Sequence, residues 1–132
     1  MPDKFIPINT AEGWQLSNPP ILSLAAVRAS LSLFDEVGME NLIDKSKKLT
    51  SYLVFLMENL SSNRISIITP EERGCQISIR VLNCNKQLFN EITTRGVIAD
   101  WREPDVIRVA PVPLYNSYMD VFNFYKILED IL

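Results

Sequence analysis

The chain has 132 residues, of which 47% are hydrophobic and 22% charged, which is enough apolar material for one ordinary globular core and argues against disorder. Its 13 basic and 16 acidic side chains leave a net charge of −3, and the lysines and arginines are scattered, so a nucleic-acid-binding face is not expected. The chain opens without a signal-peptide pattern and has no run near the roughly 18 apolar residues of a membrane span, so we expect a cytoplasmic protein.

Two long helices are predicted in the first half of the chain. A polar, proline-containing lead covers residues 1–19. Pro20 then opens a run with apolar residues at helical spacing, and Gly38 ends it. Residues 39–60 continue as a second, amphipathic helix with one apolar side, formed by Leu42, Ile43, Leu49, Leu53 and Leu56.

The second half alternates short strands with helices. A period of two predicts strands at 65–70 and 76–81, followed by a helix at 86–96 that a glycine ends. Two more strands, 97–101 and 106–110, precede a final helix over 117–132 with Ser117 as its N-cap. The order predicts an α+β fold, in which a mostly antiparallel sheet of about four strands carries helices mainly on one face, with residues 20–132 as a single small domain.

The side chains that usually carry catalysis are scarce. The chain has no histidine, and its two cysteines, Cys75 and Cys84, have no neighbouring metal ligands. A serine or cysteine nucleophile normally needs an adjacent base, so neither kind of triad is available. The four glycines stand singly, which excludes a glycine-rich phosphate loop. We therefore expect no metal, and part of a site rather than a whole one.

Arg108 is an unusual residue for its position. It lies in the apolar run VIRVA, where strand alternation places it on the opposite face from Ile107 and Val109. The side chain either takes part in a solvated or structural ion pair or binds a carboxylate, whose two oxygens match the two parallel donors of a guanidinium. Pro111 and Pro113 follow and would hold the exit of the strand rigid, which favours the second alternative.

A second unusual stretch, GWQLSNPPIL, lies at the start of the first long helix. Ser17 and Asn18 precede a Pro-Pro pair that fixes the turn into this helix. Both residue types are common helix caps, but they could equally present hydrogen-bond donors to an anion or ligand.

These two stretches also carry a family resemblance. The segments SNPP and RVAPVPLYNS, together with ITPEERGCQISI and RGVIADWREPDVI, resemble the carboxyl-terminal part of the kynureninases, pyridoxal-phosphate enzymes of tryptophan catabolism. The resemblance runs in order from about residue 13 to the end and implies the small domain of the aspartate-aminotransferase-like fold.

The resemblance also implies roles for individual residues. Arg108 would bind the α-carboxylate of the substrate, and Asn18, with Ser17 beside it, would lie near the cofactor phosphate and the substrate ring. The lysine that binds pyridoxal 5'-phosphate belongs to a large domain with no counterpart here, so the chain is expected to be a fragment that is inactive alone. The complete enzyme, expected to be a homodimer, would hydrolyse L-kynurenine, or its 3-hydroxy form, to anthranilate and L-alanine.

Three alternatives remain at this point. A free-standing ligand-binding domain would need Arg108 and Asn18 to converge in one pocket. A cysteine-based sulfur transferase would need an activated thiol at Cys75 or Cys84. A pure interaction module would use an exposed apolar face.

Overall fold

The contacts within the chain divide it into two compact units. The computed structural model describes residues 4–132. One unit ends at Gly38, and the other runs from Met39 to Leu132. The division predicted from the sequence, between residues 19 and 20, stays a prediction. No helix within residues 4–132 is both long and apolar enough to cross a membrane.

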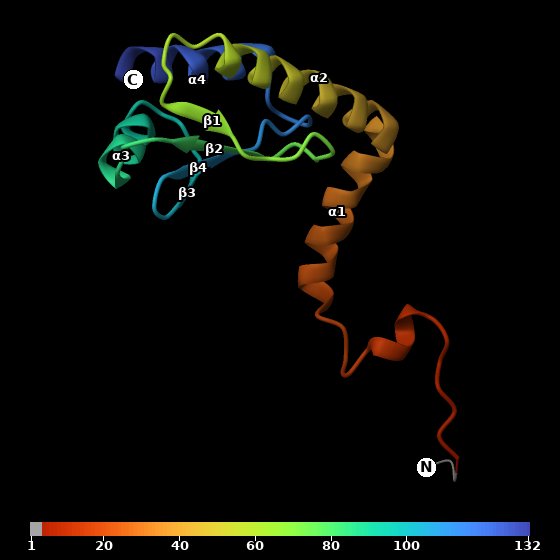
Figure 1. Cartoon of the computed structure of the whole chain (residues 1–132). Helices are drawn as coiled ribbons and strands as arrows, with labels where there is room; N and C mark the ends of the chain where they lie inside the picture. The colour runs from red at the N-terminus through yellow and green to blue at the C-terminus, as the bar shows by residue number, and fades with distance from the viewer. Residues whose placement is uncertain (1–3) are drawn as a thin grey trace. The chain divides into compact units, whose positions relative to one another are not determined.

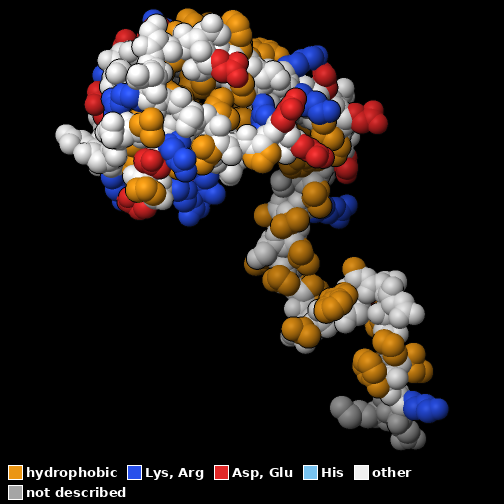
Figure 2. All heavy atoms as spheres, in the orientation of Figure 1, with side chains coloured by type: hydrophobic (Ala, Val, Ile, Leu, Met, Phe, Trp, Pro, Cys, Tyr) orange, Lys and Arg blue, Asp and Glu red, His pale blue; other side chains and the backbone are white. Residues whose placement is uncertain are grey.

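The first unit is dominated by a single apolar helix. A short 3-10 helix, η1 (Ala11–Trp14), precedes α1 (Ile21–Val37). Helix α1 begins after Pro20 and ends at Gly38, whose φ of 81° is a conformation that glycine adopts at no steric cost, so both predicted ends are confirmed. None of its residues is buried, and Figure 2 shows apolar side chains along it. A helix this apolar normally packs against other elements. Its exposed large hydrophobic residues are Ile21, Leu22, Leu24, Val27, Leu31, Leu33 and Val37.

The second unit is a four-stranded antiparallel sheet with three helices. The sheet has the strand order β1-β2-β4-β3, and every neighbouring pair is antiparallel, as predicted. The elements are α2 (Met39–Glu58), β1 (Ile65–Ile67), β2 (Ile77–Val81), α3 (Lys86–Thr94), β3 (Asp100–Arg102), β4 (Val106–Val109) and α4 (Tyr118–Ile131).

The core of this unit lies on one face of the sheet. Helices α2 and α4 run alongside each other over that face (Figure 1), and α3 adds Ile92 to the same core. The alternation of the two central strands explains this, because every second residue of β2 and β4 is buried and the residues between are not. The buried side chains that form this core cluster are Leu49, Leu53, Leu56, Met57, Ile77, Ile79, Val81, Ile92, Ile107, Val109, Val121, Phe124 and Leu128. The predicted α+β fold with helices mainly on one face is confirmed.

Three details of the predicted elements are wrong. The strand expected at 65–70 ends at Ile67, and the backbone N–H of Ser78 bonds to the side-chain Oγ1 of Thr69, at 2.7 Å, instead of to a backbone carbonyl of that strand. The strand expected at 97–101 begins only at Asp100, because the amide of Val97 still bonds to the carbonyl of Ile92, at 3.1 Å, and closes the end of α3 around Gly96. This is the hydrogen-bond pattern of a helix that ends on a left-handed residue, and Gly96 has a φ of 93°. Ile43, expected on the apolar side of α2, is 48% exposed.

The burial pattern of the sheet predicts a clear contrast between two isoleucines. Ile79→Ala, at a site with 0% exposure, should lower the free energy of unfolding of this chain by about 2–4 kcal/mol, because it leaves a cavity in the core. Ile68→Ala, where the side chain is 43% exposed, should cost less than about 1 kcal/mol. Urea denaturation of both variants measures the difference, and equal losses would contradict the assignment of the core face.

Candidate functional site

Arg108 lies on the face of the sheet opposite to the helices. In β4 it is flanked by Ser78 of β2 on one side and Asp100 of β3 on the other. Its neighbours Ile107 and Val109 are buried in the core, so alternation directs Arg108 to the other face. The side chain is 30% exposed, so it is half-buried although no helix of this unit covers it.

Arg108 forms an ion pair with Asp100. The Nε atom of Arg108 donates a hydrogen bond of 2.9 Å to Oδ2 of Asp100, and its Nη2 atom donates to the same oxygen. Arg102 also donates to this oxygen, from Nε at 3.0 Å. The hydrogen bond from Arg108 is the main reason that the pKa of the Asp100 carboxyl lies below its ordinary value. The ion-pair alternative considered from the sequence is therefore present in the structure.

This ion pair does not use all the donors of Arg108. A guanidinium offers five N–H groups, and Asp100 binds Nε and Nη2 through a single oxygen. Among the described residues, Nη1 of Arg108 has no hydrogen-bond partner. One edge of the guanidinium is thus held by the protein, and the Nη1 side can still bind a second carboxylate.

In the ion pairs on this face, arginines outnumber aspartates by one. Arg80 lies 3.6 Å, from Nε to Oδ1, from Asp105, while Arg102 and Arg108 share the carboxylate of Asp100. Three arginines therefore face two aspartates in these ion pairs. That excess suits the binding of a single carboxylate.

The segment that leaves β4 is held by two side chains. Lys45 of α2 donates from Nζ to the carbonyl oxygen of Pro113 at 2.6 Å. The Oδ1 atom of Asn116 accepts the backbone N–H of Val112 at 2.8 Å. These two contacts support the rigid exit that the prolines predict. The sequence did not predict either contact, although an asparagine shortly after two prolines is a local signal for the bond that Asn116 accepts.

Ser17 and Asn18 do not cap the first long helix. The N-cap of α1 is Pro20, and no side-chain hydrogen bond caps this end. The capping interpretation is therefore wrong, and both residues are exposed ahead of the helix. They belong to the first unit and Arg108 to the second, so their convergence on one site stays a prediction.

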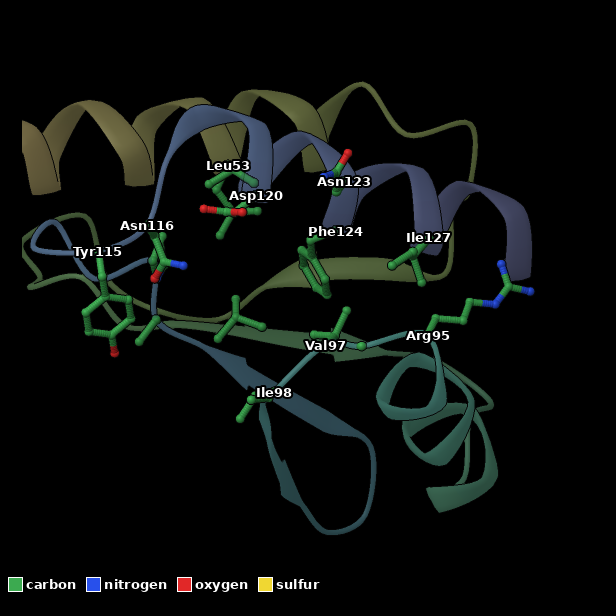
Figure 3. Close-up of a pocket in the computed structure, with 15 residues that line it drawn as sticks. Leu53, Arg95, Val97, Ile98, Tyr115, Asn116, Asp120, Asn123, Phe124 and Ile127 are labelled. Atoms are coloured by element: carbon green, nitrogen blue, oxygen red, sulfur yellow. The ribbon is translucent and has the colours of Figure 1, made fainter.

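A pocket of about 500 Å³ lies on the helix side of the sheet. Figure 3 shows Leu53 and Phe124 above it and Val97 and Ile98 below, with Tyr115 and Asn116 at one end. Arg108 and Asn18 do not line this pocket. The pocket therefore gives no support to a free-standing ligand-binding domain, which would bring those two residues together.

Within residues 4–132, the thiol and the amines whose pKa is shifted are not activated for catalysis. Burial raises the pKa of the Cys84 thiol, whereas an activated cysteine needs a lowered pKa. The carboxylates of Asp44 and Glu129 raise the pKa values of Lys48 and Lys126, and a lysine that forms an imine needs the opposite shift. Residues 4–132 contain no group of three metal-ligating side chains.

The fold is that of a small α+β domain, and the face of its sheet without helices carries a half-buried arginine, Arg108. The sequence model of the kynureninase C-terminal domain matches residues 42–128, and the chain belongs to this family. It is 51% identical to a kynureninase from Koribacter versatilis over 129 residues, which cover 96% of this chain and 30% of that protein. Its identity to a kynureninase from Stenotrophomonas maltophilia is also 51%, over 98% of this chain and 32% of that protein. The chain thus spans about a third of the length of these relatives.

The hydrogen bond from Lys45 predicts an effect on local stability. Lys45→Met keeps a long side chain but removes the donor to Pro113, so the amides of Val112 and of residues 114–116 should exchange with solvent about tenfold faster. Lys47→Met, at an exposed position of the same helix, should leave them unchanged. Hydrogen exchange followed by mass spectrometry measures both variants, and unaltered exchange in Lys45→Met would rule out this role.

Proposed function

We propose that this chain is the part of a kynureninase that positions the substrate's α-carboxylate, with Arg108 as the binding group. The full-length enzyme hydrolyses the Cβ–Cγ bond of L-kynurenine to give anthranilate and L-alanine, and 3-hydroxykynurenine is an alternative substrate. The observation that carries this proposal is the half-buried guanidinium of Arg108, which keeps donors available on a face whose ion pairs contain one more arginine than aspartate. Membership of the kynureninase C-terminal family supports it.

The contribution of Arg108 is orientation. Two parallel hydrogen bonds would fix the plane of the substrate carboxylate as well as its position, which a single point charge does not do. A fixed carboxylate holds the scissile bond in one geometry, so misplacement should reduce the rate as well as the affinity. The strand that carries Arg108 is central in the sheet, paired on both sides, and is therefore a rigid support.

Ser17 and Asn18 suit a supporting role in binding the cofactor. Ser17 and Asn18 are exposed polar side chains that do not serve as helix caps, so they can offer hydrogen bonds to a phosphate or to the substrate ring. The raised pKa values of Lys48 and Lys126 do not suit the covalent attachment of an aldehyde. When bound, pyridoxal 5'-phosphate supplies an electron sink for the carbanions of the reaction. In this chain we propose Asn18 as its contact, with Ser17 beside it.

Catalysis also requires parts of the protein beyond this chain. The chain covers about 30% of the length of the kynureninases that it matches. The apolar surface of α1 is consistent with burial against the remainder of such a protein. We propose that the full-length enzyme is a homodimer and that the 132-residue chain alone is inactive. The two free thiols, Cys75 and Cys84, are consistent with a reducing compartment such as the cytoplasm.

The role of Arg108 is tested in the full-length enzyme. Arg108→Lys keeps the charge but loses the two-pronged geometry, so kcat/KM for kynurenine should fall by about thirty- to a thousandfold, or about 2–4 kcal/mol. Steady-state assays of anthranilate release, alongside the thermal midpoint, measure the effect.

A matched control lies on the same face of the sheet. Arg80→Lys alters an arginine that is 47% exposed and paired with Asp105, so it should change kcat/KM by less than about threefold. Near-normal turnover in both Arg108→Lys and Arg108→Ala would overturn the carboxylate role. A loss of turnover with an unchanged thermal midpoint would support it.

The isolated chain should lack activity. Mixed with pyridoxal phosphate and kynurenine it should release no anthranilate, because it covers only about 30% of the length of the kynureninases that it matches and catalysis requires the rest of the protein. Fluorescence of anthranilate detects low turnover. Measurable release, with the cofactor trapped by borohydride on one lysine of this chain, would remove the requirement for the rest of the protein.

A further inference from the structure

We propose that Asp100 is the positioning residue for Arg108: its carboxylate orients the guanidinium so that the remaining donors meet the α-carboxylate of the substrate. This inference rests on the proposed function of Arg108. The inference adds Asp100, on the neighbouring strand β3, to the site and gives this residue a role in turnover.

The sheet register brings the two residues together. Asp100 of β3 lies directly opposite Arg108 of β4, and both side chains project from the face without helices. Side chains of directly opposed residues on one face of an antiparallel pair lie close enough to interact. The backbone pairing of β3 with β4 therefore determines where the carboxylate sits, so the anchor of Arg108 is as rigid as the sheet.

The contacts restrict the orientation of the guanidinium. Nε and Nη2 of Arg108 both donate to Oδ2 of Asp100, with the first bond at 2.9 Å. Two donors on one acceptor direct the Nε–Nη2 edge of the guanidinium toward Asp100 and limit the rotamers that Arg108 can adopt. An arginine without such an anchor would distribute its head group over many rotamers, and the substrate would have to order it on binding.

The charge of Asp100 also sets the net charge of the site. Arg102 and Arg108 both donate to the same carboxylate, which holds two cations side by side. Neutralising Asp100 would add one positive charge, so simple anions would be attracted more strongly but oriented less well. Loss of Asp100 should therefore affect turnover more than binding.

The carboxylate of Asp100 is ionised throughout the pH range in which enzyme activity would be measured. The hydrogen bond from Arg108 lowers the pKa of its carboxyl below the ordinary value of 3.8, so the carboxylate is ionised at neutral pH. A substitution that removes the charge should consequently have the same effect at every pH between about 6 and 9. A pH-dependent effect would point instead to a proton-transfer role.

The experiment uses the full-length enzyme and the variants Asp100→Asn, Arg108→Lys and the double variant. In Asp100→Asn we expect kcat to fall by roughly ten- to a hundredfold while KM changes by less than about threefold. Asp130→Asn, which removes an exposed carboxylate of α4 that pairs with Arg95 at the end of α3, is the charge-matched control and should leave both constants unchanged. Affinity for kynuramine, which is kynurenine without its carboxylate, should be the same in Asp100→Asn as in the wild type.

The double variant tests whether Asp100 acts through Arg108. In the Arg108→Lys background, Asp100→Asn should change kcat/KM by less than about twofold, because the group that it orients is already lost. Additive losses, or a kcat within about twofold of the wild type in Asp100→Asn alone, would overturn the inference. If Asp100→Asn does not yield folded enzyme, Asp100→Glu provides the test, because it keeps the charge but displaces it by one methylene. A lowered kcat in Asp100→Glu supports the inference, and an unaltered kcat overturns it.

The same variants distinguish an error in the proposed function of Arg108 from an error in the role of Asp100. If Arg108→Lys itself leaves kcat/KM unchanged, the carboxylate role of Arg108 is wrong, and the positioning role of Asp100 is wrong with it. If Arg108→Lys is impaired and Asp100→Asn is not, only the inference about Asp100 is wrong.

Discussion

The burial of alternate residues in the two central strands is the constraint on which the site depends. Ile107 and Val109 of β4, and Ile77 and Ile79 of β2, contribute to the core beneath the helices. A strand cannot place neighbouring side chains on the same face, so this burial directs Arg108 to the opposite face. Any slip of the register by one residue would expose the core and bury the cation, and hydrophobic burial therefore also maintains the position of the functional group.

The same sheet determines the electrostatics of the site. Arg108 meets Asp100 because β3 pairs with β4, and Asp100 in turn holds Arg102. The ion pair and the proposed carboxylate role are therefore not alternatives. One oxygen of Asp100 holds one edge of the guanidinium, while Nη1 has no hydrogen-bond partner among the described residues and is the donor that we propose for the substrate. Ion pairs of exposed groups contribute little to stability, and we propose that this one serves to orient Arg108.

The sequence predictions succeeded where a periodic pattern was long and failed where a local hydrogen bond decided the outcome. Helix α1 ends at Gly38 as predicted, because a glycine at a helix end has a specific backbone role. The strand expected at 97–101 begins only at Asp100, because the amide of Val97 bonds to Ile92 and closes the end of α3. Asn18 was interpreted as one possible cap, yet the helix starts at a proline without a side-chain cap.

The sequence by itself determined the element types, the antiparallel character of the sheet and the outward direction of Arg108, since all three follow from the spacing of apolar residues along the chain. It also carried the resemblance to the kynureninases through short segments around Asn18 and Arg108. Only the tertiary structure decided that Asp100 holds Arg108 and that Lys45 holds the exit segment at Pro113. The physical reason is that these contacts join residues through strand register and helix packing, which depend on how the whole chain folds rather than on the spacing within any one segment.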